Sequence, residues 1–189
     1  EMKVQANTLR AGNVVEIGGK LLVVIKSQII TPGKGGAFVQ VEMKGIQDGV
    51  KKDERYRTGE TVERAQLDDN EYQYLYGDGD TYTFMDQVSF EQITVPRDII
   101  GEPARWLQEN MICSIRTHEG RPLVVELPAT VTLEITEAEP AVKGQTASSS
   151  YKTAVLENGE KIMVPVHIGP GTRVVVSTED GSYKERAKD

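Results

Sequence analysis

Short segments rich in β-branched and aromatic residues, separated by turn-forming residues, recur along the whole 189-residue chain. This pattern predicts β-strands, because strands are short, favour these residue types and end at Gly, Pro, Asn or Asp. The predicted strands cover residues 13–17, 21–30, 38–44, 72–76, 82–85, 111–116, 123–127, 130–136, 161–164 and 172–177. The fold class is therefore predicted to be mostly β.

One helix is predicted, from about Ile99 to Asn110. Pro103 suits the first turn of a helix, and Trp106 and Leu107 give the segment a partly apolar face. Trp106 is expected to be a core residue rather than a platform for stacking a base.

Many short strands with so little helix favour small barrels over a doubly wound fold. Three segments of about 62 residues each would fit small five-stranded barrels. We therefore predict three small β-barrel domains, at residues 1–64, 65–127 and 128–189. The last two share length and strand content, but they show no convincing repeat of residues.

Charge is distributed unevenly among these segments. Residues 1–64 carry 11 Lys and Arg against 8 Asp and Glu, a net charge of +3. Residues 65–127 carry a net charge of −8 and residues 128–189 a net charge of −2. The first segment can therefore approach RNA, whereas the acidic middle is expected to avoid phosphate or to face a basic protein, unless the split is ordinary surface variation.

Composition also limits the compartment. Cys113 is the one cysteine, so no internal disulfide can form, and the N-terminus lacks the pattern of a secretory leader. The longest aliphatic run, residues 21–25, is far shorter than the roughly 20 apolar residues that cross a bilayer. We expect a cytoplasmic protein without a membrane partner.

A glycine-rich loop lies between two predicted strands. It reads Ile29-Ile30-Thr31-Pro32-Gly33-Lys34-Gly35-Gly36-Ala37-Phe38. Glycine allows a close approach of the backbone to a partner, and proline stiffens the loop. Lys34 is therefore predicted to project from an exposed hairpin tip without bulky neighbours, in a form suited to a narrow site. Taken alone, such a loop is usually a turn with a solvated lysine.

Other local signals do not support chemistry. A Walker loop needs Ser or Thr after its lysine and then a helix, but here Gly35 and a strand follow Lys34. Asp78-Gly79-Asp80 lacks the remaining ligands of an EF-hand and is predicted to be a hairpin turn. Cysteine and histidine spacing gives no zinc site, and the chain has no nucleophile elbow. We predict no metal site and no catalytic residue.

Two separated motifs stand out in a chain of this length and organisation. The first is Pro32-Gly33-Lys34-Gly35-Gly36-Ala37-Phe38. The second consists of Lys152-Thr153-Ala154, Gly159, Ile162, Val164-Pro165, Ile168 and Gly171. With these motifs the chain resembles the elongation factor P family over essentially its whole length. The resemblance implies a KOW or SH3-like N-terminal domain followed by two OB-fold domains, in an L-shaped arrangement that mimics tRNA.

By the same resemblance, the protein is a translation factor and not an enzyme. It would bind the 70S ribosome between the P and E sites and promote peptide bond formation where synthesis stalls at consecutive prolines. Lys34 would point toward the CCA end of the P-site peptidyl-tRNA. Members of the family usually carry a covalent extension here, often β-lysyl, which implies a lysine-modifying enzyme as a further partner. No cofactor is expected, and tRNA mimicry favours a monomer.

The resemblance also places RNA contacts in the C-terminal segment. A loop beginning Gly144-Gln145-Thr146 would reach ribosomal RNA and the E-site mRNA, although the family usually has Asp in place of Gln145 and Gly in place of Ser148. Codon-side contacts are therefore expected to differ. Tyr183 and Arg186 would contact the P-site tRNA near its anticodon stem, unless Tyr183 serves in barrel packing.

Three other functions remain open from the sequence. The first is an elongation factor P-like paralogue with a different mRNA preference. The second is an OB-barrel protein that binds single strands, but the charge of −8 in the middle segment disfavours a nucleic-acid groove. The third is an enzyme, for which the sequence offers no convergent polar site.

Overall fold

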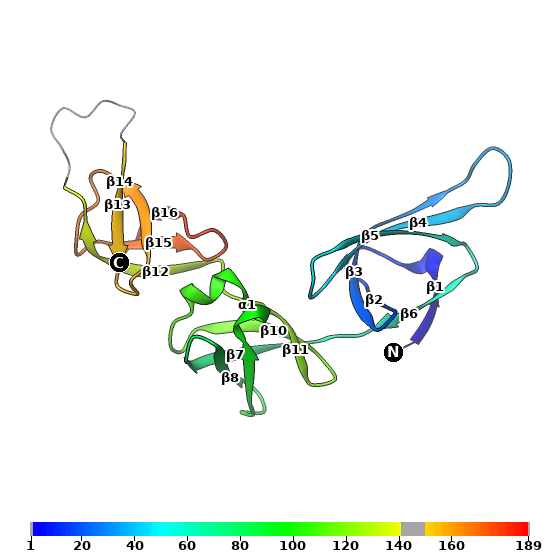
Figure 1. Ribbon diagram of the computed structural model, residues 1–189, viewed down its shortest axis with the longest axis horizontal. Coiled ribbons are helices and arrows are strands. Elements are labelled where there is room, and N and C mark those ends of the chain that lie inside the picture. Colours follow the sequence, from blue (N-terminus) through cyan, green and yellow to red (C-terminus); the bar gives the residue numbers. More distant parts are fainter. Residues whose placement is uncertain (1, 141–149, 189) are drawn as a thin grey trace. The chain divides into compact units, whose positions relative to one another are not determined.

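The computed structural model describes residues 2–140 and 150–188, and nearly all of its regular structure is β-strand. The strands form three antiparallel sheets of six, five and five strands (Figure 1). The predicted fold class, mostly β, is confirmed.

The N-terminal sheet has the strand order β1-β6-β2-β3-β4-β5. Its strands are β1 (Met2–Gln5), β2 (Val14–Ile17), β3 (Lys20–Ile30), β4 (Phe38–Gly45), β5 (Lys51–Arg57) and β6 (Thr61–Ala65), and a short 3-10 helix, η1 (Ala6–Thr8), follows β1. Alternate residues of β3 and β4 face the core, in which Val24, Val39, Val41 and Met43 are at most 1% exposed. Burial of this one face fixes how the central strands pair.

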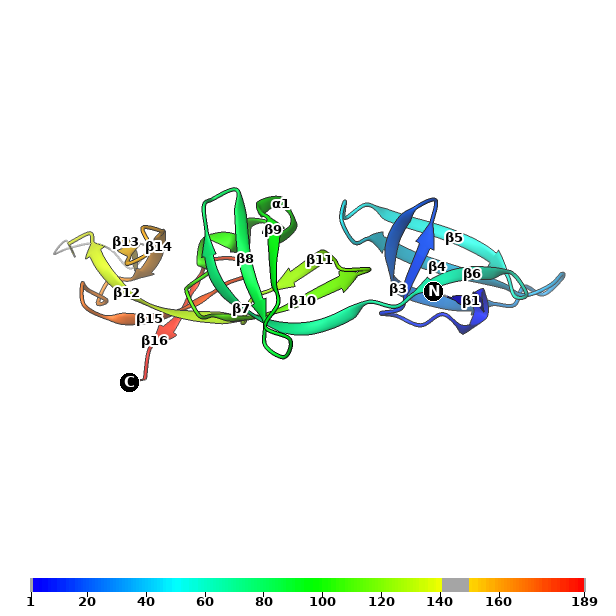
Figure 2. The ribbon, with the colours of Figure 1, turned by 90° about the horizontal axis from the view of Figure 1, so that it is seen from below.

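The middle sheet has the order β11-β10-β7-β8-β9 (Figure 2). Its strands are β7 (Asp68–Gly77), β8 (Thr81–Asp86), β9 (Gln92–Pro96), β10 (Ile112–His118) and β11 (Arg121–Glu126). The turn between β7 and β8 is closed by Asp78, whose Oδ1 accepts hydrogen bonds from the backbone N–H groups of Asp80 (2.9 Å) and Thr81 (2.8 Å). These bonds hold the pKa of the Asp78 carboxyl below its usual range. The predicted hairpin turn is confirmed.

The C-terminal sheet has the order β14-β13-β12-β15-β16. Its strands are β12 (Thr130–Ala138), β13 (Tyr151–Leu156), β14 (Lys161–Pro165), β15 (Arg173–Ser177) and β16 (Tyr183–Arg186). The first half of β12 pairs with β15 and the second half with β13, and the register shifts between Ile135 and Glu137. One long strand therefore serves two partners by bending at an irregularity, as β-bulges allow.

The sequence prediction was wrong about the helix and incomplete about the strands. Instead of one helix from Ile99 to Asn110, a single turn, α1 (Arg97–Ile100), precedes a 3-10 helix, η2 (Glu102–Trp106). Gly101 interrupts them at φ +77° and ψ −157°, outside the helical region. Six strands were not predicted: β1, β5, β6, β9, β13 and β16. The first sheet has six strands instead of the expected five. Charged β5 and short β1 carry little apolar signal. No helix within the described residues is long and apolar enough to cross a membrane.

Residues group into two compact units rather than one per sheet. The first comprises Glu1–Asn70 with Ile115–Val125, and the second comprises Glu71–Ser114 with Glu126–Asp189. The domain boundaries near residues 64 and 127 and the L-shaped arrangement stay predictions.

Trp106 lies in the core of the second unit, as a core residue was expected to. It is 1% exposed and clusters with apolar side chains of β12, β13, β14 and β15, including Leu133 and Val174. The Arg105 guanidinium carbon lies 5.0 Å from the centre of its ring, and Nη1 of Arg105 lies 3.6 Å from the Glu160 carboxylate. Stacking on Trp106 and pairing with Glu160 hold this arginine against the core.

Gly181 lies against the side chains of Arg105 and Trp106, and this contact can be tested by measuring stability. A Cβ on Gly181, at φ +74°, would lie 2.8 Å from Nη2 of Arg105 and 3.0 Å from Cζ2 of Trp106, whereas a Cβ on Gly171, at φ +89°, would meet nothing within 4 Å. Gly171→Ala is expected to cost about 1 to 2 kcal/mol from backbone strain alone. Gly181→Ala is expected to cost roughly 1 kcal/mol more because of overpacking. Urea unfolding of both variants measures the difference, and equal costs would contradict the contact.

Cys113, on β10, is a core thiol that is 1% exposed. Burial raises the pKa of Cys113 to about 12, so the thiolate that reacts with disulfide reagents is scarce at neutral pH. We expect labelling of the native protein at pH 8 to be roughly 100-fold or more slower than labelling of the urea-unfolded chain, whose cysteine has a pKa of about 8.5. Absorbance of the released thiol measures both rates, and rapid labelling without urea would show that Cys113 is accessible.

Candidate functional site

The hairpin of β3 and β4 presents the predicted lysine. Eight residue pairs join the two strands, from Leu22 opposite Gly45 to Ile30 opposite Phe38, and residues 31–37 form the tip. In Figure 1 the hairpin extends as an arm away from the rest of its sheet. The long ladder therefore carries a short irregular segment out to an exposed position.

Lys34 stands at this tip with Pro32, Gly33, Gly35 and Gly36, and all five residues are exposed. Within the described residues, the Lys34 ammonium group makes neither an ion pair nor a side-chain hydrogen bond. Three donors of a strongly hydrated cation therefore remain available for a partner. The structure brings Lys34 and the four predicted loop residues together.

The glycines of the tip differ in what they require. Gly35 adopts φ +99°, a conformation that a residue with a Cβ rarely occupies. A Cβ on Gly33 or Gly36 would meet no atom of the chain within 4 Å, and neither residue has a positive φ of this kind. Packing within the protein therefore does not require glycine at these two positions, which is consistent with close approach of an external surface.

The outward face of the strands next to the hairpin tip carries two arginines. Phe38 pairs with Arg57 and Gln40 with Arg55 across β4 and β5, and the Arg55 guanidinium carbon lies 4.1 Å from the centre of the Phe38 ring. Stacking on an aromatic face orients a guanidinium and leaves its edge free to donate hydrogen bonds. Sequence reasoning missed Arg55, because its contact with Phe38 is diagonal across two strands and depends on their register.

The opposite face of the same strands packs against the core of the first sheet. Val39 and Val41 are fully buried there, and Tyr56 of β5 packs against the same core. Burial raises the pKa of the Tyr56 hydroxyl, and the nearby carboxylates of Glu54 and Glu60 raise it further. The phenol is therefore neutral at physiological pH, and this face serves packing.

The predicted C-terminal contact residues lie on β16. Arg186 is exposed opposite Val174, whereas the Tyr183 ring is partly buried and packs against the core around Trp106. Barrel packing thus accounts for part of the Tyr183 side chain. Gly144, Gln145 and Thr146, together with Ser148, lie outside the described residues.

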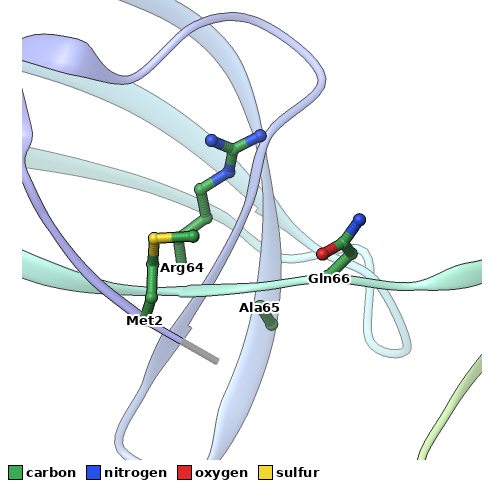
Figure 3. A pocket seen from close by; sticks show the side chains of 4 residues that line it. All are labelled: Met2, Arg64, Ala65 and Gln66. Atoms are coloured by element: carbon green, nitrogen blue, oxygen red, sulfur yellow. The ribbon is translucent and has the colours of Figure 1, made fainter.

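A small pocket of the first unit offers no alternative chemistry. It is lined by Met2, Arg64, Ala65 and Gln66 (Figure 3). Met2 and Arg64 are paired across β1 and β6, and in Figure 3 the Met2 thioether lies beside the Arg64 stem. An amide, a guanidinium and a thioether supply neither an activated nucleophile nor an acid and base pair.

The two kinds of tip glycine generate a stability test. Gly36→Ala is expected to change the free energy of unfolding by less than about 0.5 kcal/mol, because the added methyl group enters open space. Gly35→Ala is expected to cost about 1 kcal/mol, because alanine is strained at the positive φ. Urea unfolding of the two variants measures both values. A large loss for Gly36→Ala would show that the chain itself needs glycine there.

Comparison with known proteins covers the same three sheets. The KOW-like domain of elongation factor P matches residues 5–62, its OB domain matches residues 67–125, and its C-terminal domain matches residues 131–186. The KOW-like and OB-type architecture implied by the sequence motifs is therefore confirmed.

Curated relatives match over the full length. The chain is 58% identical over 188 residues to elongation factor P of Rhodospirillum centenum and 56% identical to that of Methylorubrum populi, with 100% of each chain covered. These relatives are named for a translation factor rather than for an enzyme.

Solved structures show the same fold. A eukaryotic translation initiation factor 5A from Methanococcus jannaschii superposes with a TM-score of 0.58 at 26% identity, over 67% of this chain and 94% of the other. An initiation factor 5A family protein from Naegleria fowleri superposes with a TM-score of 0.54 at 18% identity, over 67% and 98%, which supports the fold alone. The three matched domains and the full-length identity show that the chain belongs to the elongation factor P family of translation factors.

Proposed function

We propose that this protein binds the 70S ribosome between the P and E sites and promotes peptide bond formation at polyproline stalls. The observation that carries the proposal is the exposed Lys34, a cation without a partner among the described residues, at the end of a projecting hairpin. Membership of the elongation factor P family supports a role in translation, and the hairpin supplies the part that would reach into the ribosome.

Positioning of the peptidyl-tRNA explains how such a hairpin promotes the reaction. The proline ring fixes φ and removes the backbone N–H, so the reacting ester and amine seldom align. A cation that hydrogen-bonds the phosphates of the CCA end holds the peptidyl-tRNA in a reactive pose and lowers the entropic cost of alignment. The ribosome performs the chemistry, and Lys34 acts neither as nucleophile nor as base.

The surroundings of Lys34 suit an RNA partner. On the outward face of the sheet, the two rows next to the tip hold Ile30, Phe38 and Arg57, then Gln28, Gln40 and Arg55, and neither row contains a carboxylate. Arginine and glutamine side chains both donate hydrogen bonds to phosphate and sugar oxygens. Arg55 and Arg57 therefore add to the attraction that Lys34 exerts on phosphate.

A covalent extension of Lys34 would lengthen this arm. The open space around the tip allows a modifying enzyme to reach the amine, since a Cβ on Gly33 or Gly36 would meet nothing within 4 Å. A β-lysyl group would carry a further ammonium farther along the CCA backbone. The lysine-modifying enzyme is thus a second proposed partner.

The C-terminal segment would make the remaining contacts. Arg186 is exposed and able to pair with a phosphate of the P-site tRNA, and the unburied edge of Tyr183 could meet a sugar. Gly144, Gln145 and Thr146 would meet ribosomal RNA and the E-site mRNA. We propose that the protein acts in the cytoplasm, as a monomer.

Replacement of Lys34 tests the proposal. Lys34→Ala is expected to abolish rescue of a polyproline message in a reconstituted translation system, because the cation that aligns the CCA end is lost. Peptide mass spectrometry of protein from the native host is expected to show an added group on Lys34. The measured rate is that of full-length product formation, compared with a message that lacks proline runs.

Two control variants show whether a loss of rescue is due to the extension on Lys34 or to the loss of a positive charge. Lys34→Arg keeps the charge but lacks the amine that receives the extension, so its loss of rescue would assign the effect to the extension. Lys20→Ala removes the same charge from the far end of β3, where Lys20 pairs with Asp48 at 3.1 Å, and is expected to rescue normally. Normal rescue by Lys34→Ala would refute the proposed role of the hairpin.

A further inference from the structure

Phe90 occupies an unusual position in the loop that joins β8 to β9. It adopts φ +63° while its side chain is 67% exposed, and Val88 beside it is 86% exposed. The loop lies at the end of this hairpin that is opposite the β7–β8 turn (Figure 2). Two apolar side chains are thus exposed within one short loop.

The loop is held by hydrogen bonds to Asp86. Its Oδ1 accepts from the backbone N–H groups of Val88 (2.7 Å) and Ser89 (3.1 Å), and its carbonyl accepts from the Phe90 N–H at 3.0 Å. The Asp86 N–H in turn donates to the Glu91 carbonyl at 2.9 Å. These four bonds fix the backbone of the turn, and the left-handed conformation of Phe90 is part of that turn geometry.

An aromatic residue is a poor choice for this conformation. The left-handed region crowds the Cβ against the backbone, and glycine normally supplies it. Among the described residues, the other non-glycine residues with positive φ are Asn110 and Glu119, both polar. Phe90 is apolar and too exposed for packing to compensate its strain. Backbone strain that no packing interaction offsets points to a functional role for the residue.

The charge around the loop indicates which partner fits. Residues 65–96 contain seven Asp and Glu and no Lys, Arg or His. Asp86 and Glu91 flank the loop, and Glu71 is joined to it through its carbonyl, which accepts from the Gln87 N–H at 3.0 Å. Such a field repels the phosphate backbone of RNA and attracts a surface rich in Lys and Arg.

We propose that Phe90, with Val88 beside it, inserts into an apolar pocket with a basic rim on a protein of the ribosome. The inference rests on the proposed function only in taking the ribosome as the source of the partner. A buried aromatic anchor surrounded by a polar rim is a common form of an interface hot spot. This contact holds the middle sheet against protein, whereas the Lys34 hairpin meets RNA.

Phe90→Gly tests the proposal, because it separates folding from binding. Glycine accepts the positive φ, so the Tm is expected to stay constant or to rise by up to about 4 °C. Affinity for purified 70S ribosomes is expected to fall about tenfold or more, as truncation of a central anchor does. Phe90→Tyr keeps the aromatic ring and is expected to bind within about twofold of the original protein.

Glu119→Gly is the matched control. It relieves a positive φ of +52° in another hairpin turn and is expected to leave ribosome affinity unchanged. A photo-reactive benzoylphenylalanine at position 90 is expected to crosslink a basic ribosomal protein. Crosslinking to ribosomal RNA, unchanged affinity of Phe90→Gly, or equal loss of affinity in Glu119→Gly would each overturn the proposal.

Rescue assays on the same preparations separate this inference from the proposed function. If the original protein binds ribosomes without rescuing polyproline synthesis, and Phe90→Gly still weakens binding, the proposed function fails and the anchor stands. If the original protein rescues, and Phe90→Gly binds and rescues equally well, the anchor alone fails. Absence of ribosome binding by the original protein would refute both.

Discussion

The register between β3 and β4 is the constraint on which the position of Lys34 depends. A slip of one residue would turn every side chain of a strand to the other face. It would expose Val39, Val41 and Met43, which are fully buried, and would direct Phe38 and Gln40 into the core. Burial of one face thus selects a single pairing. The position of the tip is therefore set by the packing of apolar side chains farther down the hairpin.

Charge is distributed unevenly along the chain, and the two proposed contacts lie in segments of opposite net charge. The first 64 residues carry a net charge of +3, and a stretch of 32 residues from position 65 onward contains no cationic side chain. The Lys34 hairpin rises from the first segment and the Phe90 loop from the second. Salt weakens phosphate contacts steeply, whereas burial of the Phe90 ring would give its contact a part that does not depend on charge. The two contacts would therefore respond differently to ionic strength.

Much of the fold was predictable because most strands alternate around an apolar face. The central strands of all three sheets, the Asp78 turn and the burial of Trp106 follow from residue types. Strand β5 was missed because its inward positions are Lys52, Glu54 and Tyr56, which give no apolar period. The prediction of a single helix was wrong because Gly101 adopts a conformation that ends a helix. Tertiary context overrides local helix propensity at this position.

The candidate site was predictable only where the local sequence determines it. The glycines and proline around Lys34 specify an exposed tip from residue types alone. Stacking of Arg55 on Phe38 requires knowledge of two registers, and the left-handed Phe90 requires backbone angles. Pairings between distant strands and strained dihedral angles leave little trace in a single sequence, so both features became visible only in the structure.

Trp106 has a consequence for how the chain is assembled. It belongs to the segment between β9 and β10, yet it is the largest fully buried side chain and lies in the core that β12 to β15 enclose. A fragment beginning at residue 128 would contain every strand of the C-terminal sheet and still lack the indole at its centre. The C-terminal strands therefore complete their core with a residue from an earlier stretch of chain. During synthesis, Trp106 is made before any strand of the C-terminal sheet.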